Sequence, residues 1–299
     1  MKWLQTCSLL TLGFALSATA KVSGQQVQFT HIDYQFLDGS KADSTQAWGI
    51  NPRGDIVGFY VESNVTHGFV LSGGIYSSVD FPGAKSTFAN GINARGDIVG
   101  AYVDSGGVTH GFLLIGNSYS SIDFPGALST AALGIGPQGD IVGDYSVTSV
   151  VDCCAAGTHG YLLSGDSFTS VDLLAAEVIL TYASGINPHG SIVGSYSDGR
   201  GRAFLLDHDT YIPLQYPDKG TTFMNALGIN ARGEIVGRYV NATGRHGYVM
   251  SQREIQTIDI PGATFTGATA INSEGDIVGR YSVGGVFHGF LLSRHEVGR

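Results

Sequence analysis

The sequence predicts an all-β fold, a six-bladed β-propeller with four strands in each blade. Of its 299 residues 44 are Gly, and charged residues make up only 14 %, against a usual share of ~25 %. Gly, Ser, Val, Ile and Tyr suit turns and strands, whereas Gly inside a helix costs ~1 kcal/mol relative to Ala. A hydrophobic fraction of 43 % argues against disorder. The net charge of −9 argues against a nucleic-acid partner, because little positive charge is available to neutralise phosphates.

The first 20 residues have the pattern of a secretion signal peptide. A short positive start at Met1–Trp3 precedes an apolar stretch at Cys7–Leu16 and an Ala-x-Ala cleavage site at Ala18–Ala20. The stretch is shorter than the ~20 residues that a membrane span needs, so no transmembrane segment is expected. The sequence therefore predicts a secreted or periplasmic protein with residues 21–26 as a short linker.

A repeat of about 42 residues organises the rest of the chain. Its Gly-Ile-Asn-like start recurs at spacings of 42, 43, 51, 43 and 42 residues. The six starts are Gly49, Gly91, Gly134, Gly185, Gly228 and Ala270.

Each repeat resolves into four short strands. The first ends at Gly-Ile-Asn and turns through a segment such as Asn51–Gly54, whose Asn, Pro and Gly favour a tight turn. A second strand follows in Gly-Asp-Ile-Val-Gly-x-Tyr, a third in His-Gly-Phe-Leu-Leu, and a fourth in Ser-Ile-Asp-Phe before Pro-Gly-Ala. Four strands in ~42 residues are typical of a propeller blade.

The two chain ends complement each other. The sixth repeat ends at His288–Ser293 without a fourth strand, and Phe29–Tyr34 matches a fourth strand without a blade before it. We expect these segments to pair, because an open array would leave unpaired strand edges. The expected domain covers residues 27–293, followed by a tail at 294–299.

The ordered motifs resemble those of the HAF-type extracellular repeat family, which is named after a His-Ala-Phe-like triplet. The triplets here include His67–Phe69 and His110–Phe112, and the fourth repeat departs from them with Arg202–Phe204. The resemblance covers about residues 27–293 and implies an exported repeat protein. It brings no established catalytic residues.

The repeated His residues are predicted to be structural. Each precedes the Asp of its own fourth strand by 13 residues, as in His67 and Asp80 or His110 and Asp123. A residue present in nearly every blade is expected to serve the blade, because buried polar groups need fixed partners.

Ligand-facing residues are expected where the repeat varies. The position before the Gly-Ile-Asn start should line the axial mouth, and it varies between repeats. Together with neighbouring candidates, the predicted ligand-binding residues are Trp48, Asn90, Tyr182, Ser184, Asn225 and Thr269.

Three loops near this face are longer than their counterparts and contain acids or cysteines. They bring Asp43, Glu177 and the adjacent Cys153 and Cys154. Outside the cytoplasm three states are open to the two cysteines: a disulfide between them, pairing between chains, or the reduced form. The plain alternative is a tolerated surface insertion. Calcium prefers carboxylate and amide oxygens, so Asp43, Asn90, Glu177 and Asn225 are the predicted Ca²⁺ ligands.

Two function classes follow. The first is a calcium-dependent hydrolase of small esters or lactones, such as acyl-homoserine lactones, with Glu177 and Asp43 as catalytic residues. It rests on analogy with six-bladed gluconolactonase-like and paraoxonase-like enzymes, whose motifs the chain does not show. The second is a non-catalytic extracellular module that binds glycans, envelope polymer or partner proteins through residues such as Trp48 and Tyr182. Nucleophile elbows, His-Glu-x-x-His and phosphate loops are absent from the sequence.

Overall fold

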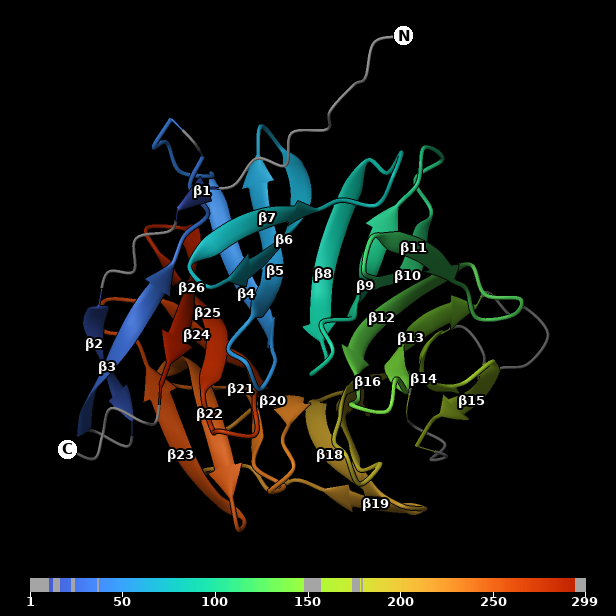
Figure 1. The fold of residues 1–299 in the computed structure, drawn as a ribbon. Coiled ribbons are helices and arrows are strands. Elements are labelled where there is room, and N and C mark those ends of the chain that lie inside the picture. Colours follow the sequence, from blue (N-terminus) through green and yellow to red (C-terminus); the bar gives the residue numbers. More distant parts are fainter. Residues whose placement is uncertain are drawn as a thin grey trace, which may run out of the picture.

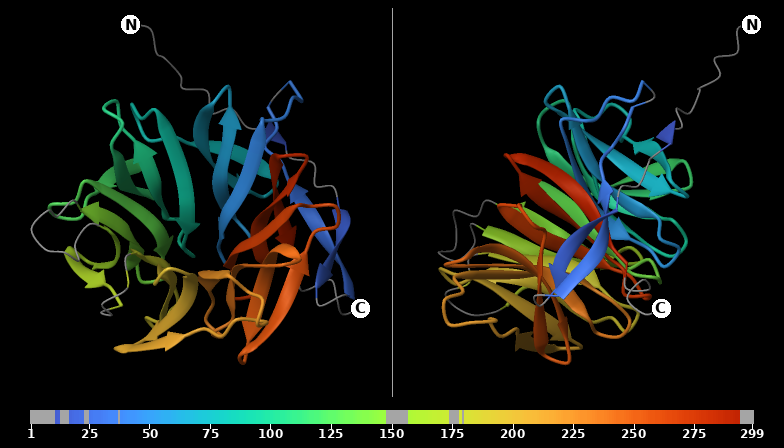
Figure 2. Two further views of the ribbon diagram at one scale, coloured as in Figure 1. Left: turned by 180° about the vertical axis from the view of Figure 1, so that it is seen from behind. Right: turned by 90° about the vertical axis from the view of Figure 1, so that its left-hand side faces the viewer.

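The structure, a computed structural model, describes residues 11–12, 17–22, 25–36, 38–147, 157–173, 178 and 180–293. Every element within these ranges is a β-strand, and the strands form a propeller-like arrangement around a common axis (Figures 1 and 2). They fall into six successive sets of antiparallel strands, which we number 1 to 6 along the chain. No helix in the described part of the chain has the length and apolar character to cross a membrane.

The first two strands of each set lie nearest the axis. The first strands are β4 (Ser44–Ile50), β8 (Ser86–Ile92), β12 (Ser129–Ile135), β16 (Leu180–Ile186), β20 (Phe223–Ile229) and β24 (Phe265–Ile271). The second strands are β5 (Ile56–Glu62), β9 (Ile98–Val103), β13 (Ile141–Val147), β17 (Ile192–Ser197), β21 (Ile235–Asn241) and β25 (Ile277–Val283).

The outer strands follow the predicted motifs. The third strands are β6 (Val65–Ser72), β10 (Thr109–Ile115), β14 (Gly157–Ser164), β18 (Gly201–Asp207), β22 (Gly244–Ser251) and β26 (Val286–Leu292). The fourth strands of sets 1 to 5 are β7 (Ile75–Val79), β11 (Ser118–Ile122), β15 (Ser167–Val171), β19 (Thr210–Pro213) and β23 (Glu254–Asp259).

Set 6 takes its outer strand from the other end of the chain. Strand β3 (Gln25–Ile32) pairs antiparallel with β26, with Ile32 opposite Gly289, as the sequence predicts (Figure 1). Next to this pairing, His288 Nδ1 lies 2.8 Å from a carboxylate oxygen of Asp33. Sets 6 and 1 are also joined near the axis, because the Thr269 hydroxyl donates to the Ala47 carbonyl at 2.9 Å.

The sequence predicts a linker at residues 21–26, and the structure corrects this, because most of these residues belong to a hairpin. Strand β2 (Ser17–Val22) pairs with β3 and also with β23, and Lys21 and Val22 form the contacts to β23. The hairpin forms because backbone groups at a sheet edge are satisfied by a further strand. A two-residue strand β1 (Thr11–Leu12) pairs with β7. Cleavage after Ala20 would remove β1 and most of β2, including the buried Ala20 side chain. The tail at 294–299 lies outside the described residues.

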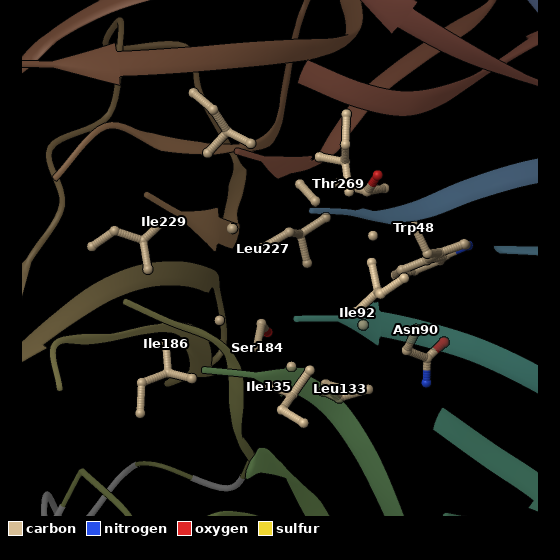
Figure 3. Close-up of a pocket in the computed structure, with 18 residues that line it drawn as sticks. Trp48, Asn90, Ile92, Leu133, Ile135, Ser184, Ile186, Leu227, Ile229 and Thr269 are labelled. Atoms are coloured by element: carbon tan, nitrogen blue, oxygen red, sulfur yellow. The ribbon is translucent and has the colours of Figure 1, made fainter. Parts of the chain in front are cut away.

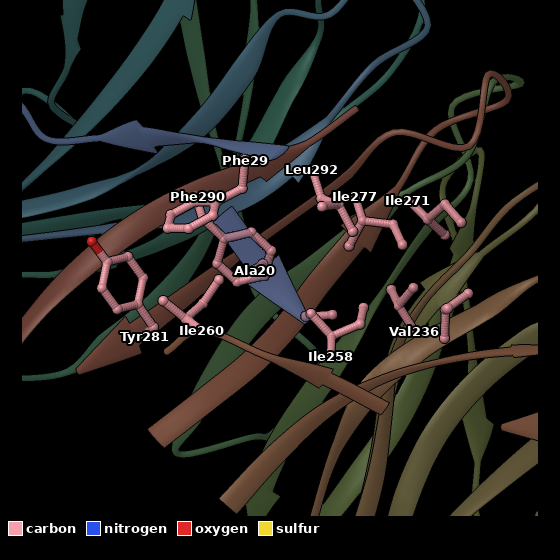
Figure 4. Packing of buried hydrophobic residues seen from close by; sticks show 12 residues of the cluster. Ala20, Phe29, Val236, Ile258, Ile260, Ile271, Ile277, Tyr281, Phe290 and Leu292 are labelled. Carbon is pink, nitrogen blue, oxygen red and sulfur yellow. The ribbon is translucent and has the colours of Figure 1, made fainter. Parts of the chain in front are cut away.

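The core lies between neighbouring sets. One buried cluster joins Phe29 of β3 with Ile277, Tyr281 and Phe290 of set 6 and Ile258 of β23 (Figure 4). Burial of such side chains contributes about 1.5–3 kcal/mol each.

Each of the four His–Asp pairs that the spacing predicts forms a hydrogen bond, which confirms them, and the fifth repeated His, His288, bonds Asp33 from the other end of the chain. Nδ1 to carboxylate distances run from 2.6 to 3.1 Å for His67–Asp80, His110–Asp123, His159–Asp172, His246–Asp259 and His288–Asp33. In set 2 the Tyr102 ring stacks on His110 at 5.1 Å and on Phe81 from set 1 at 3.7 Å. The His therefore fixes a ring sandwich that links two neighbouring sets.

Replacing His110 by Ala should lower the free energy of unfolding by ~1 kcal/mol, because Asp123 loses its partner. Burial alone would lower the pKa of His110, but Asp123 and Asp104 raise it above its usual value. The charged contribution is thus full below pH ~6.5 and is lost as pH rises through the folded-state pKa. Denaturant unfolding at pH 6 and pH 9 should show the larger deficit at pH 6.

The matched control is His208→Ala, because the His208 side chain is 83 % exposed in a hairpin. It should unfold like the parent protein at both pH values. Equal effects of the two substitutions would contradict a structural role for the repeated His.

Candidate functional site at the axial mouth

A β-bulge in every first strand directs one side chain toward the axis. The pairing register shifts on either side of the residue before Gly-Ile-Asn, so that this residue has no cross-strand partner. The bulge residues are Trp48, Asn90, Leu133, Ser184, Leu227 and Thr269. With the two residues that follow each of them, they line an axial cavity of about 90 Å³ (Figure 3).

A larger cavity of about 520 Å³ opens beside the axis between sets 3, 4 and 5. We call it the vestibule. It shares Trp48, Leu133, Ser184 and Leu227 with the axial cavity. Its other lining residues are Asp144, Leu180, Tyr182, Ser195, Tyr196, Ser197, Gly201, Phe223, Asn225 and Arg238.

Strand register explains why these side chains meet. The residue after Gly-Asp-Ile-Val-Gly lies opposite the residue two positions before the bulge, as in Ser195 with Tyr182 and Arg238 with Asn225. Both members of these two pairs line the vestibule. The position after the motif differs between repeats and is occupied by Phe59, Ala101, Asp144, Ser195, Arg238 and Arg280.

Two guanidinium groups are stacked among aromatic rings on one side of the mouth. Arg238 Cζ lies 5.0 Å from the centre of the Phe223 ring and 5.5 Å from that of Phe265. Arg280 Cζ lies 5.4 Å from the Phe265 ring and 4.7 Å from the Trp48 ring. Such cation–π contacts hold a guanidinium in one plane and partly offset its burial.

Neither guanidinium has an acid partner among the described residues. Burial lowers the pKa of Arg238, with Arg245 adding to it. Burial and then the neighbouring Arg238 lower the pKa of Arg280 to about 10. Four other arginines do form ion pairs with carboxylates, namely Arg53, Arg95, Arg202 and Arg232.

Further polar groups of the mouth are unpaired. Within the described chain, Trp48 Nε1 and Arg238 Nε are buried donors without an acceptor. Asp144 extends into the same vestibule, and burial alone raises the pKa of its carboxyl to about 7. Because buried polar groups are normally paired, this concentration of unpaired groups makes the mouth the candidate functional site.

The structure brings four of the predicted ligand-binding residues into the vestibule: Trp48, Tyr182, Ser184 and Asn225. Asn90 and Thr269 line the axial cavity instead. Their side chains donate to carbonyl groups of the next set, Asn90 to Ala132 and Thr269 to Ala47. These two residues therefore also link neighbouring sets.

The three predicted calcium ligands that the structure describes, Asp43, Asn90 and Asn225, do not line one cavity. Asp43 is exposed at the start of β4 and is not among the residues that line either cavity; it accepts a hydrogen bond from Ser63 N at 3.0 Å. Asn225 Oδ1 accepts from Arg238 N at 3.1 Å. Glu177, like Cys153 and Cys154, lies outside the described residues. No group of three or more His, Cys, Asp or Glu suited to a metal occurs in the described part of the chain.

Sequence reasoning missed Asp144, Arg238 and Arg280. The available signal was the variable position between Gly-Asp-Ile-Val-Gly and Tyr, which is as irregular from repeat to repeat as the bulge position. Placing it at the mouth requires the strand register, since alternate residues of a strand face opposite ways.

Comparisons with known proteins support the fold. No family model and no curated protein matches the chain. Among solved structures it is similar to the β-propeller domain of the Trilobed protease from Pyrococcus furiosus, described as having an open velcro topology, with 11 % identity, 96 % coverage of both chains and a TM-score of 0.56.

Two further structures resemble it at similar levels. The Aleuria aurantia lectin in complex with Fucα1-6GlcNAc has 14 % identity and a TM-score of 0.53, covering 83 % of this chain and 91 % of the lectin. TolB from Acinetobacter baumannii has 12 % identity and a TM-score of 0.54, covering 85 % of this chain and 64 % of TolB. At these identities the likeness establishes a shared β-propeller fold.

Replacing Asp144 by Asn should stabilise the protein at pH 8. Burial raises the pKa of the folded-state carboxyl from its ordinary 3.8 to about 7, so the carboxyl costs nothing below pH ~4, destabilises increasingly between pH ~4 and 7, and keeps its full penalty above pH 7. Three pKa units correspond to about 4 kcal/mol, which is the upper limit of the gain. Urea unfolding of both proteins at pH 4 and pH 8 should show a difference only at pH 8. Equal stability at pH 8 would contradict an unpaired buried carboxyl.

Proposed function

We propose that the protein is a non-catalytic binding module whose ligand enters the vestibule. One observation carries the proposal: the side chains that differ between repeats converge at the mouth. The positions between the sets repeat instead, such as Val57, Val99 and Val142, which are fully buried. A position that is free of the repeat's packing demands can be adapted to a ligand. The lectin among the similar structures shows that a protein of this fold binds a saccharide.

We also propose that the six sets form a closed six-bladed propeller. Support comes from the β3–β26 pairing, the Thr269–Ala47 hydrogen bond, and the hydrogen bond of Asn272 Nδ2 to the Asn51 carbonyl at 3.2 Å. All of these join the two ends of the chain.

The closed ring predicts a strong dependence on the N-terminal strand. Deleting residues 21–36 from the mature chain should cost several kcal/mol, because the edge of β26 loses its partner beside an apolar core. A chain that starts at Lys21 is the control. Identical melting temperatures for the two chains would contradict closure through β3.

We also propose that the protein is secreted with cleavage after Ala20 and that it belongs to the HAF-type repeat family. Both rest on the sequence motifs. N-terminal sequencing of the exported protein tests the cleavage position.

The proposed cleavage would leave a single Trp residue, whose fluorescence is a direct probe of the site. The chain has two Trp residues, and loss of Trp3 would leave Trp48 alone, beside the vestibule. Titration with oligosaccharides should therefore change the intrinsic fluorescence of the mature protein. Tyr182→Ala should weaken binding at least tenfold, a loss of about 1.4 kcal/mol, whereas Tyr182→Phe should keep the stacking surface. Saturable binding with no response to either substitution would place the ligand elsewhere.

A second candidate is the hydrolase of small esters or lactones, for which the sequence nominates Asp43, Asn90, Glu177 and Asn225 as Ca²⁺ ligands. One observation favours acid–base chemistry at the mouth: the Asp144 carboxyl has a pKa of about 7, the range in which general acids and bases work best. Purified mature protein should then hydrolyse aryl esters or lactones, and chelation and Glu177→Gln should each reduce the rate more than tenfold. Turnover that survives chelation would contradict the calcium mechanism, and turnover that survives Asp144→Asn would exclude Asp144 as its acid or base.

A further inference from the structure

We propose that Arg238, which lines the vestibule, binds the carboxylate of an acidic saccharide there, and that Arg280, on the other side of the Phe265 ring, adds positive charge beside it. This inference rests on the proposed binding function and names its ligand class. It starts from charge: the chain has 25 acidic residues, yet none forms an ion pair with these two partly buried guanidinium groups in the part that the structure describes.

Burying an unpaired charge is costly, and proteins usually pair such a group or place it in contact with water. Here two like charges lie close enough for Arg238 to disfavour the charged form of Arg280. A ligand anion would relieve both the burial and the repulsion. The four exposed arginines of the chain that do have carboxylate partners show that the fold supplies them where a salt bridge is structural.

The guanidinium groups are held in place for such an anion. The rings of Trp48, Phe265 and Phe223 alternate with Arg280 and Arg238, and Arg280 Nη1 also donates to Gln46 Oε1. Stacked faces leave the edge of a guanidinium for hydrogen bonding, and that edge matches a carboxylate with two parallel N–H···O bonds. Arg238 Nε is already a buried donor without an acceptor.

The rest of the vestibule suits a sugar ring. Tyr182 and Phe223 offer aromatic faces, and Ser184, Ser195 and Ser197 offer hydroxyl groups around a volume of about 520 Å³. Trp48 Nε1 is a second unpaired donor. Aromatic faces beside many small polar groups fit the apolar face and the hydroxyl edge of a saccharide better than a purely apolar acid.

The test measures binding of defined uronic-acid oligosaccharides, namely oligogalacturonates, oligoguluronates and oligomannuronates, each against its carboxyl-reduced neutral form. Fluorescence of Trp48 and calorimetry report binding to the mature protein. At least one acidic series should bind ten times more tightly than its reduced form. Its affinity should fall as ionic strength rises, because the contact is ionic.

Variants assign the effect to the two arginines. Arg238→Gln should weaken acidic binding at least tenfold, and Arg238→Lys should recover only part of it because it lacks the planar fork. Arg280→Gln should weaken acidic binding less, because it removes charge beside the vestibule and no contact within it. Arg253→Gln is the matched control, since it removes the same charge from an exposed hairpin residue and should leave affinity unchanged. Far-UV circular dichroism confirms folding, and the reduced ligands test the inference in the parent protein without any substitution.

The outcomes separate the two proposals. Equal binding of acidic and neutral forms would overturn the carboxylate site while leaving the binding function intact. Binding of sulfate or phosphate with no saccharide preference would also overturn the saccharide inference. If none of these saccharides binds and only esters or lactones respond, both this inference and the binding-module proposal fail in favour of the hydrolase.

Discussion

The close approach of the first strands at the axis is the constraint on which the rest of the structure depends. A Cβ atom on Gly49 would lie 3.0 Å from the Asn90 carbonyl oxygen, and one on Gly134 would lie 2.7 Å from that of Ser184. Only residues without a large side chain fit there, so Gly recurs at the same point of the repeat. The β-bulge beside this Gly accommodates one extra residue, and the side chain of that residue projects into the mouth. Crowding at the axis thus creates the variable positions of the site.

The polar residues at the two ends of the axis therefore have different roles. At the end opposite the mouth, the Asn-x-Arg-Gly-Asp turns link neighbouring sets: Arg53 Nη1 donates to the Ala94 carbonyl at 2.9 Å, and Asn51 Nδ2 donates to the Asn93 carbonyl at 3.3 Å. Residues that recur in the repeat form these hydrogen bonds, so the polar groups of the turns stabilise the contact between neighbouring sets. At the mouth, the polar groups of Trp48, Asp144, Arg238 and Arg280 do not form such links between sets. They are unpaired or stacked on aromatic rings instead. A repeat protein can in this way vary its site without weakening its ring.

Sequence reasoning predicted the strands, the His–Asp pairs and the N-terminal strand beside β26, because each is a local pattern repeated five or six times. It also placed the bulge residues at the axis. It did not find Asp144, Arg238 or Arg280, because their alignment with Ala131, Asn225 and Gly267 of the first strands depends on strand pairing rather than on spacing. Residues 21–26, which include the end of β2 and the start of β3, were read as a linker because a short polar stretch carries no signal that it will cover an edge. The calcium ligands were chosen for chemistry alone, and Asp43 lies on the exposed approach to β4.

The pairing of β3 with β26 also sets the order of folding. His288 and Asp33 meet across 255 residues of chain, so this contact forms only after the last repeat has been made. The entropy of closing so long a loop grows as (3/2)RT ln n, which is about 5 kcal/mol for a chain segment of this length. Folding that depends on such distant contacts is slow compared with folding through local ones. Strand β3 therefore stays without its partner until β26, some 255 residues further along the chain, has been made.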